Sequence, residues 1–332
     1  MRIFLAGDHV TGTGPANVTK YYIANLPHGT LYQKRRMKAA RALEILINTI
    51  RADVVVYSGY SKQNILGLKL AKKMGKPSAY IMHGCVEHEN AINLEPDEEM
   101  NRVERKTMEM SDLILAVSDK FASWLRENYP QFADRIDVLS NGIDTDMIHN
   151  ARERTEYDRH MIFSIGGGMP RKKIKHICEA VEILRRDFDP DMYLCVIGDK
   201  GADSEAINSY DFVKNLGIVT FAEGVSLFHK AALFVQNSCF ETFGLAPVEA
   251  LACGCPILCS KEVGALSILK DVRDTDIIER FDDPCEIASK IRFNVENSNS
   301  KRLSADLEWE SNSWKVRSNA LVSKLSKLVQ MK

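Results

Sequence analysis

The chain has neither a long hydrophobic run nor an excess of charge of one sign. No stretch reaches the roughly 18 consecutive apolar residues that a transmembrane helix requires. The 44 basic and 45 acidic residues leave a formal net charge of -1, which argues against a general nucleic-acid binder acting through a basic excess. Residues 1–8 are too short and too quickly interrupted by polar residues for a signal peptide. We therefore expect them to form a first strand.

The eight cysteines also lack the context in which disulfides form, because no secretion signal precedes them. We expect them to stay reduced and most of them to fill the core as small apolar side chains. Cys253 and Cys255 flank Gly254, but such a pair alone does not specify a metal site. The 332 residues, 45% of them hydrophobic and 27% charged, predict a soluble, cytoplasmic protein of about two domains.

Short apolar runs alternate with helical patterns along the chain. Strands are expected at 2–7, 53–57, 78–82, 113–117 and 138–139, and again at 161–165, 192–197, 219–221, 233–235 and 256–259. Uninterrupted apolar runs joined by helices are typical of buried parallel strands. The polar residues 145–160 between the two sets indicate a linker. The pattern predicts an α/β protein with two Rossmann-like, doubly wound domains facing each other across a cleft.

The most informative segment runs from Glu241 to Glu249. Gly244 lets the main chain approach a ligand closely, and Pro247 suits the first turn of a helix. Free N–H groups at the start of that helix can hold a diphosphate, while the two carboxylates accept hydrogen bonds from hydroxyls on either side. The alternative is an ordinary junction between a loop and a helix with an acidic first turn.

A second candidate phosphate site follows the strand at 161–165. There Gly166, Gly167 and Gly168 precede Arg171 and Lys172. Glycines let main-chain N–H groups approach a diphosphate, and the cations neutralise its charge. The alternative is a solvated basic helix start, which is unfavourable unless an anion is present.

The first half of the chain carries two further candidate sites. Gly12 and Gly14 lie between the first strand and a helix that contains Asn17, but the third glycine of a dinucleotide fingerprint is missing. His83 directly follows a strand, where open α/β sheets bind ligands. With Glu87 and His88 it also suggests zinc, although no distant cluster offers the remaining ligand.

Together these motifs resemble the retaining glycosyltransferases of family 4 that serve bacterial polysaccharide synthesis. The E-x7-E segment, the glycine loop, the histidine and the turn at residues 141–144 occur in the family's order. The resemblance implies the GT-B fold, with an acceptor-side domain at 1–148, a nucleotide-sugar domain at 149–308, and a helix at 309–332 that crosses back onto the first domain. Residues 166–173 depart from the family's Gly-Arg and Lys-Gly, and residues 223–230 look like a shortened nucleotide-side loop.

The resemblance also implies roles for individual residues and for substrates. Catalytic roles fall to His83, Glu241, Arg171 and Lys172. Donor binding falls to Gly12, Gly14, Gly167, Gly168, Thr242, Phe243, Gly244, Leu245 and Glu249, and the acceptor side to Asn17, Glu87 and His88. The expected reaction moves a sugar from a UDP- or GDP-linked donor to a glycan or lipid-linked glycan, without a metal or cofactor. A nucleotide-sugar epimerase, a non-catalytic sugar-nucleotide-binding subunit and, more remotely, an NAD dehydrogenase are the alternatives.

The segment at 34–50 combines basic and apolar residues. Lys34, Lys38 and Arg41 share one helical face, while Leu43 and Ile50 share another with Ala39 and Leu46. One interpretation is a surface helix that covers the sheet. The other is peripheral contact with an anionic membrane at the inner face of the plasma membrane.

Overall fold

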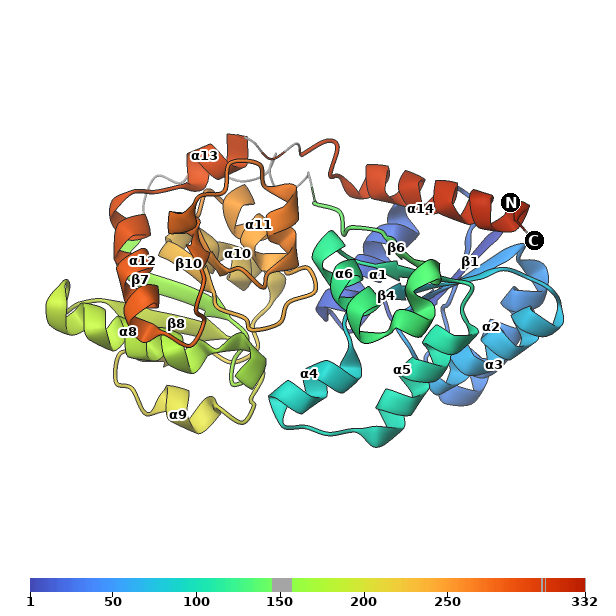
Figure 1. Cartoon of the computed structure of the whole chain (residues 1–332), viewed down its shortest axis with the longest axis horizontal. Coiled ribbons are helices and arrows are strands. Elements are labelled where there is room, and N and C mark those ends of the chain that lie inside the picture. The colour runs from blue at the N-terminus through green and yellow to red at the C-terminus, as the bar shows by residue number, and fades with distance from the viewer. Residues whose placement is uncertain (145–156, 306, 308, 332) are drawn as a thin grey trace. The chain divides into compact units, whose positions relative to one another are not determined.

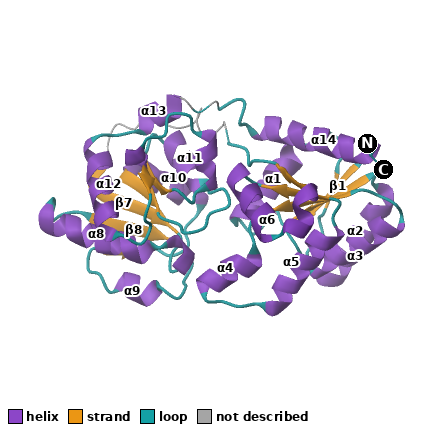
Figure 2. Cartoon of the chain, viewed as in Figure 1, coloured by secondary structure: helices purple, strands orange, loops and turns teal. Residues whose placement is uncertain are grey.

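A computed structural model describes residues 1–144, 157–305, 307 and 309–331. The chain forms two compact units. The first comprises Met1–His88, Pro96–Gly142 and Glu310–Lys332, and the second Glu89–Glu95 and Ile143–Trp309. Each unit contains one parallel sheet flanked by helices (Figures 1 and 2). The expected domain limit at residue 148 and residues 145–156 of the expected linker lie outside the described residues.

The sheet of the first unit has six parallel strands in the order β2-β1-β3-β4-β5-β6. Its strands are β1 (Ile3–Gly7), β2 (Leu31–Tyr32), β3 (Val54–Ser58), β4 (Ser78–Met82), β5 (Leu113–Ala116) and β6 (Ile136–Val138). The helices here are α1 (Gly14–Asn25), α2 (Lys38–Arg51), α3 (Lys62–Lys73), α4 (Val86–Asn93), α5 (Glu98–Met110), α6 (Asp119–Asn128), η1 (Pro130–Arg135) and α14 (Trp314–Gln330). Helix α4 begins in this unit, and its last residues cluster with the second.

The sheet of the second unit also has six parallel strands, in the order β12-β11-β10-β7-β8-β9. Its strands are β7 (Asp158–Ile165), β8 (Tyr193–Ile197), β9 (Val213–Asn215), β10 (Ala231–Gln236), β11 (Ile257–Ser260) and β12 (Ile277–Ile278). The helices are η2 (Pro170–Lys172), α8 (Ile174–Asp187), α9 (Ser204–Asn208), α10 (Phe221–Lys230), α11 (Ala246–Ala252), η3 (Gly264–Ile268), η4 (Asp274–Asp276), α12 (Pro284–Glu296) and α13 (Ser300–Ala305).

The strand orders place a topological switch point in each sheet. The chain reverses its direction of growth between β1 and β3 in the first sheet and between β7 and β10 in the second. In open α/β sheets, ligands bind outside the carboxyl ends of the strands at such a point. The segments that follow β1 and β3 in the first unit, and β7 and β10 in the second, are therefore where each unit should bind a ligand.

The last helix, α14, returns to the first unit, as expected for the C-terminal helix. Trp314 stacks on Tyr21 of α1 with ring centroids 4.9 Å apart and meets Tyr22 edge-on at 5.4 Å. Gly142 leaves the space for this indole, because a Cβ at that position would lie 2.6 Å from a Trp314 ring atom. Lys324 adds an ion pair with Asp137. The glycine of the 141–144 turn is thus required by packing.

Residues 219–221, expected as a strand, are not one. Thr220 caps α10, and its side chain and that of Glu223 form a reciprocal capping box with the main chain. The short strands β2, β9 and β12 were not expected. Residues 223–230, which resembled a shortened loop, belong to α10.

Helix α2 does not bury the face expected to cover the sheet. Its buried residues are Ile45, Asn48 and Thr49, while Leu43 is 60% and Ile50 55% exposed. Other expectations hold: all eight cysteines are free, and six of them are buried. Within the described residues, no helix has the length and apolar character to cross a membrane.

Candidate active site

Glu241 lies at the carboxyl edge of the second sheet, five residues beyond the end of β10. Its side chain is only 11% exposed and forms an ion pair with Lys172. The same carboxylate oxygen accepts hydrogen bonds from Gln236 Nε2 at 2.8 Å and Ser238 Oγ at 3.4 Å. Burial alone would raise the pKa of Glu241, but the charges of Lys172 and Arg171 lower it to about 2. Glu241 is therefore ionised at neutral pH.

Arg171 and Lys172 reach Glu241 from η2, the short 3₁₀ helix that follows the glycine loop after β7. Arg171 Nη1 lies 3.5 Å from the Glu241 carboxylate and donates to the Phe240 carbonyl at 3.2 Å. Burial lowers the pKa of Lys172, although the charge of Glu241 opposes this. Arg171 and Lys172 thus both pair with the Glu241 carboxylate at the switch point between β7 and β10. An anionic ligand bound there would compete with Glu241 for the two cations.

The loop from Thr242 to Leu245 carries main-chain donors beside these cations. Among the described residues, the N–H groups of Phe243, Gly244 and Leu245 donate to no protein acceptor. Phe243 is 1% exposed, so its ring anchors the loop. Gly244 has a φ of 82°, and a Cβ there would lie 3.0 Å from the Glu241 side chain. Glycine is therefore required for the turn that presents these donors.

Glu249, the second carboxylate of the segment, lies in the first turn of α11. Burial raises the pKa of Glu249 to about 7. No hydrogen bond to its carboxylate is formed within the described part of the chain. The two glutamates thus differ: Glu241 is held by cations, whereas Glu249 is a partly buried acid able to accept a hydrogen bond from a ligand.

Two of the three glycines after β7, Gly167 and Gly168, are required by neighbouring main chain. A Cβ at Gly167 would lie 2.0 Å from the Asp199 carbonyl oxygen, and one at Gly168 would lie 2.6 Å from the Gly201 main-chain nitrogen. Gly167 also has a φ of 55°. The loop thus packs directly against the loop after β8, and the predicted contact of Gly167 and Gly168 with a donor remains a prediction.

The carboxyl edge of the first sheet carries His83, directly after β4. Its Nε2 atom lies 2.8 Å from Ser58 Oγ at the end of β3. Burial lowers the pKa of His83 to about 4, so the ring is neutral at physiological pH. The arrangement suits a group that exchanges hydrogen bonds with a neutral ligand.

Gly12 lies in the exposed loop before α1, and Gly14 is the first residue of that helix. Thr13 caps the helix by accepting from the Ala16 N–H group, and Gly12 has a φ of 77°. No atom lies within 4 Å of a Cβ built on either glycine. The Asn17 side chain donates to the Gly12 carbonyl at 3.4 Å. The loop is therefore open to a ligand.

The predicted acceptor-side residues Glu87 and His88 have separate partners. Both oxygens of Glu87 bind Arg105 at 2.7 Å, and the His88 ring lies 4.8 Å from the ring of Trp124. They do not gather with His83 as zinc ligands would. Within the described residues, the group with suitable metal-ligand spacing is His160, Asp189 and Asp191 in the second unit.

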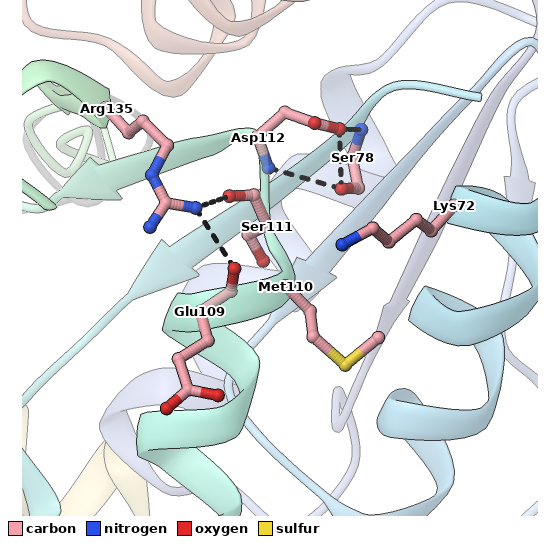
Figure 3. A pocket seen from close by; sticks show the side chains of 7 residues that line it. All are labelled: Lys72, Ser78, Glu109, Met110, Ser111, Asp112 and Arg135. Carbon is pink, nitrogen blue, oxygen red and sulfur yellow. Dashed lines mark hydrogen bonds between the residues drawn. The ribbon is translucent and has the colours of Figure 1, made fainter. Parts of the chain in front are cut away.

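A pocket of about 200 Å³ lies at the opposite edge of the first sheet, near the start of β4 and β5 (Figure 3). Its polar side chains hold the fold together. Asp112 accepts from the main-chain and side-chain donors of Ser78, and Arg135 donates to the main-chain carbonyls of Glu109, in the last turn of α5, and Ser111, directly after it. We therefore assign this pocket a structural role.

Four residues that support the candidate site were not predicted. Gln236 and Ser238 bind Glu241, and Ser58 and Thr19 connect to His83. Only their position at the ends of strands could have indicated these residues. Ser58 ends β3 and Gln236 ends β10, both at the carboxyl edge of a sheet. Small polar residues are common at strand ends, so that signal alone is weak.

Comparison with known proteins identifies the class. Residues 6–147 match the family model "Glycosyltransferase Family 4", and residues 147–307 match "Glycosyl transferases group 1". An uncharacterized glycosyltransferase of Methanocaldococcus jannaschii is 24% identical over 87% of this chain and 81% of its own length. The D-inositol 3-phosphate glycosyltransferase of Pseudarthrobacter chlorophenolicus is 28% identical over 64% of this chain, which spans 55% of that relative.

Solved structures agree on the fold. HepE of Anabaena, determined in complex with UDP-glucose, superposes with a TM-score of 0.71 at 15% identity, covering 98% of this chain and all of that one. Fold and matched domains define an enzyme of the glycosyltransferase class with the GT-B architecture. The chain belongs to glycosyltransferase family 4.

Proposed function

We propose that this protein is a retaining glycosyltransferase that moves a sugar from a UDP- or GDP-linked donor to a glycan acceptor, a lipid-linked one in cell-surface polysaccharide synthesis. The observation that carries the proposal is the cluster of Arg171, Lys172 and Glu241 beside unused main-chain donors at the switch point. Cations and free N–H groups at this edge suit a diphosphate. A relative named O-antigen chain mannosyltransferase B, from Escherichia coli and 26% identical over 54% of this chain, supports the substrate class.

The proposed chemistry follows from charge. Cleavage of the bond between the sugar and the diphosphate gives an oxocarbenium-like carbon and a developing negative charge on the leaving phosphate. Arg171, Lys172 and the N–H groups of residues 243–245 stabilise that charge. Glu241 orients the two cations and binds sugar hydroxyls, and Glu249 binds the ribose. The departing phosphate takes the proton of the acceptor hydroxyl, so the reaction requires neither an enzyme nucleophile nor a metal.

The test combines donor binding with turnover. Thermal-shift screening of UDP-, GDP- and ADP-sugars identifies the donor, because a ligand that binds only the folded state raises the melting temperature. Transfer with that donor is then measured with EDTA for the wild type and for Lys172→Met. Loss of one charge-assisted contact to the leaving group should reduce transfer at least ~10-fold. Lys175→Met, an exposed position on α8, serves as the control.

The same experiment distinguishes the two alternatives, an epimerase and a non-catalytic subunit, from a transferase. An epimerase would convert the donor sugar without an acceptor, and a non-catalytic subunit would bind the donor without releasing nucleotide. Unchanged transfer in Lys172→Met, or activity abolished by EDTA and restored by a divalent cation, would overturn the proposed chemistry.

Peripheral membrane binding through α2 is part of the proposal. Leu43, Ile47 and Ile50 form an exposed apolar stripe on this helix, with exposed fractions of 60%, 45% and 55%. The exposed basic residues Lys34, Arg35, Arg36 and Lys38 lie at its start. An apolar stripe beside cations suits a helix lying on an anionic bilayer.

Vesicle sedimentation tests this part. The wild type should pellet with vesicles that contain phosphatidylglycerol and stay in solution with pure phosphatidylcholine. Leu43→Asp should abolish pelleting. The matched control is Ile218→Asp, which places the same charge on a residue of the second unit that is 76% exposed. Equal pelleting of Leu43→Asp and the wild type would exclude α2 as the contact.

A further inference from the structure

Three side chains from different elements form a continuous hydrogen-bonded chain that ends at His83. Thr19 of α1 donates from Oγ1 to the Pro15 carbonyl at 2.9 Å. The same oxygen lies 2.7 Å from Ser58 Oγ, which lies 2.8 Å from His83 Nε2. All of these residues belong to the first unit. This series of hydrogen bonds connects α1, the helix after the glycine loop, to His83, the predicted catalytic histidine.

The direction of each hydrogen bond follows from counting protons. A hydroxyl has one proton, and a carbonyl oxygen can only accept. Because Thr19 gives its proton to the Pro15 carbonyl, the short contact with Ser58 requires Ser58 to donate. Ser58 Oγ then has no proton left for His83 and must accept from Nε2–H. Nδ1 is therefore the unprotonated nitrogen of the neutral ring.

Burial and packing keep this chain intact. Thr19 is 1% and Ser58 6% exposed, so bulk water does not compete for these bonds. Gly7, at the end of β1, leaves the space in which the two side chains meet. A Cβ on Gly7 would lie 2.7 Å from the Ser58 carbonyl oxygen and 3.2 Å from Thr19 Cγ2. The close approach of Ser58 and Thr19 to the main chain of β1 thus explains the glycine at this position.

We propose that Thr19 and Ser58 are positioning residues that fix His83 as its Nε2-protonated tautomer, so that Nδ1 serves as a hydrogen-bond acceptor for a substrate hydroxyl. The substrate part rests on the proposed function. An acceptor nitrogen selects a sugar or glycan hydroxyl, because phosphate oxygens at neutral pH have no proton to donate to it. His83 therefore recognises sugar, and the leaving phosphate is left to the second unit.

The tautomer can be read directly by two-bond nitrogen–proton NMR correlation on the intact, nitrogen-15-labelled protein at pH 7.5, with His83→Gln used to assign the signals. In the wild type, Nε2 should show the shift of a protonated ring nitrogen and Nδ1 that of an unprotonated one. In Thr19→Val, Ser58 loses its acceptor and can donate to Nε2, so the pattern should move toward the opposite tautomer. Thr19→Ser should keep the wild-type pattern.

Thr107→Val is the matched control. Thr107 is also fully buried in the first unit and also donates to the carbonyl four residues earlier, at 2.8 Å, but it has no link to His83. Its removal should leave the His83 signals unchanged. A wild-type ring protonated at Nδ1, or equal spectra for folded Thr19→Val and the wild type, would overturn the proposal whether or not the protein transfers sugar.

Measurements of kcat test the role of His83 Nδ1 in the reaction separately from the tautomer of the ring. Loss of the correctly placed acceptor should lower kcat in Thr19→Val ~10-fold, the value of one hydrogen bond, with Thr19→Ser close to wild type. An inverted tautomer with unchanged kcat would refute a role of His83 Nδ1 in the reaction. Absence of transfer by the wild type with every nucleotide sugar would refute the proposed function instead, while the NMR result would still decide the tautomer.

Discussion

At the scale of single residues, the site depends on two glutamates with opposite electrostatic surroundings. Glu241 shares its carboxylate with two cations and has a pKa of about 2, whereas burial raises that of Glu249 to about 7. One carboxylate is therefore permanently charged, and the other can change its charge near neutral pH. The ionisation of each glutamate should therefore affect stability or ligand binding in a way that can be measured.

Replacing Glu241 by Gln should destabilise the second unit. The carboxyl pKa falls from about 4.5 to about 2 on folding, which corresponds to about 3 kcal/mol at neutral pH. Because the folded-state pKa is lowered, this contribution is present above pH 4.5 and lost as the pH falls toward 2. The free energy of unfolding of Glu241→Gln, measured with urea at pH 7, should be lower by about 3 kcal/mol.

A double-substitution cycle provides the control. Lys172→Met alone leaves a buried carboxylate with one cation fewer, but Glu241→Gln with Lys172→Met removes both charges of the pair. The double variant should therefore lose clearly less than the sum of the single losses. Strict additivity would contradict a coupled pair.

Glu249 should link nucleotide-sugar binding to proton release. A carboxyl with a pKa of about 7 is half protonated at pH 7, and ribose hydroxyls that donate to it favour the charged form. Calorimetry in two buffers of different ionisation enthalpy should show release of about half a proton per ligand at pH 7. Glu249→Gln should bind more weakly and release none.

The raised pKa of Glu249 should also lower the stability of the folded protein at neutral pH. Because the folded-state pKa of Glu249 is raised, stability falls as the pH rises from about 4.5 to 7. Glu249→Gln should thus be stabilised relative to the wild type by about 1–3 kcal/mol at pH 8 and by little at pH 4.5. A pH-independent difference would exclude this titration.

The residues that the sequence identifies are those whose position and chemistry are both distinctive. Glu241, Arg171 and Lys172 are recognisable because charged residues follow apolar strands and flank glycines, and the structure brings them together. Thr19 and Ser58 are not, because their connection depends on strands and helices that are distant in sequence. A hydrogen-bond chain between small hydroxyls has no local pattern.

At the scale of elements, the start of α8 is strained. Lys173, the residue before this helix, has a φ of 51° and a ψ of 31°, a left-handed conformation that favours glycine. The related family has glycine after the corresponding lysine. Lys173→Gly should therefore raise the free energy of unfolding by about 0.5–1 kcal/mol in urea titrations.

The control for this change lies two residues further on. Lys175 is an exposed residue within α8, so Lys175→Gly should lower stability by about 1 kcal/mol. If both variants lost stability equally, the left-handed conformation of Lys173 would not be the source of strain.

Elements were predictable where the apolar pattern was long. Strand β4 occupies the expected residues 78–82, because five consecutive apolar or small residues end at a histidine and glycine. Residues 219–221 were misassigned, because three residues carry no period and the capping box of Thr220 and Glu223 outweighs them. In α2, burial of Asn48 and Thr49 in place of Leu43 could not be inferred from an apolar face.

At the scale of the whole molecule, two sheets with different strand orders each provide a carboxyl edge. The sequence predicts two doubly wound units from alternating strands and helices, and both sheets confirm this. It does not predict the strand order, which arises from crossovers between distant segments. The placement of one substrate between the two edges remains a prediction.

The most direct test of the central claim is hydrogen–deuterium exchange of the intact protein with and without its nucleotide sugar, in the presence of EDTA. A diphosphate held by main-chain N–H groups should slow exchange at residues 241–249 and 166–173 of the second unit. Binding that leaves both segments unprotected and protects only the loop at residues 12–17 would contradict the account.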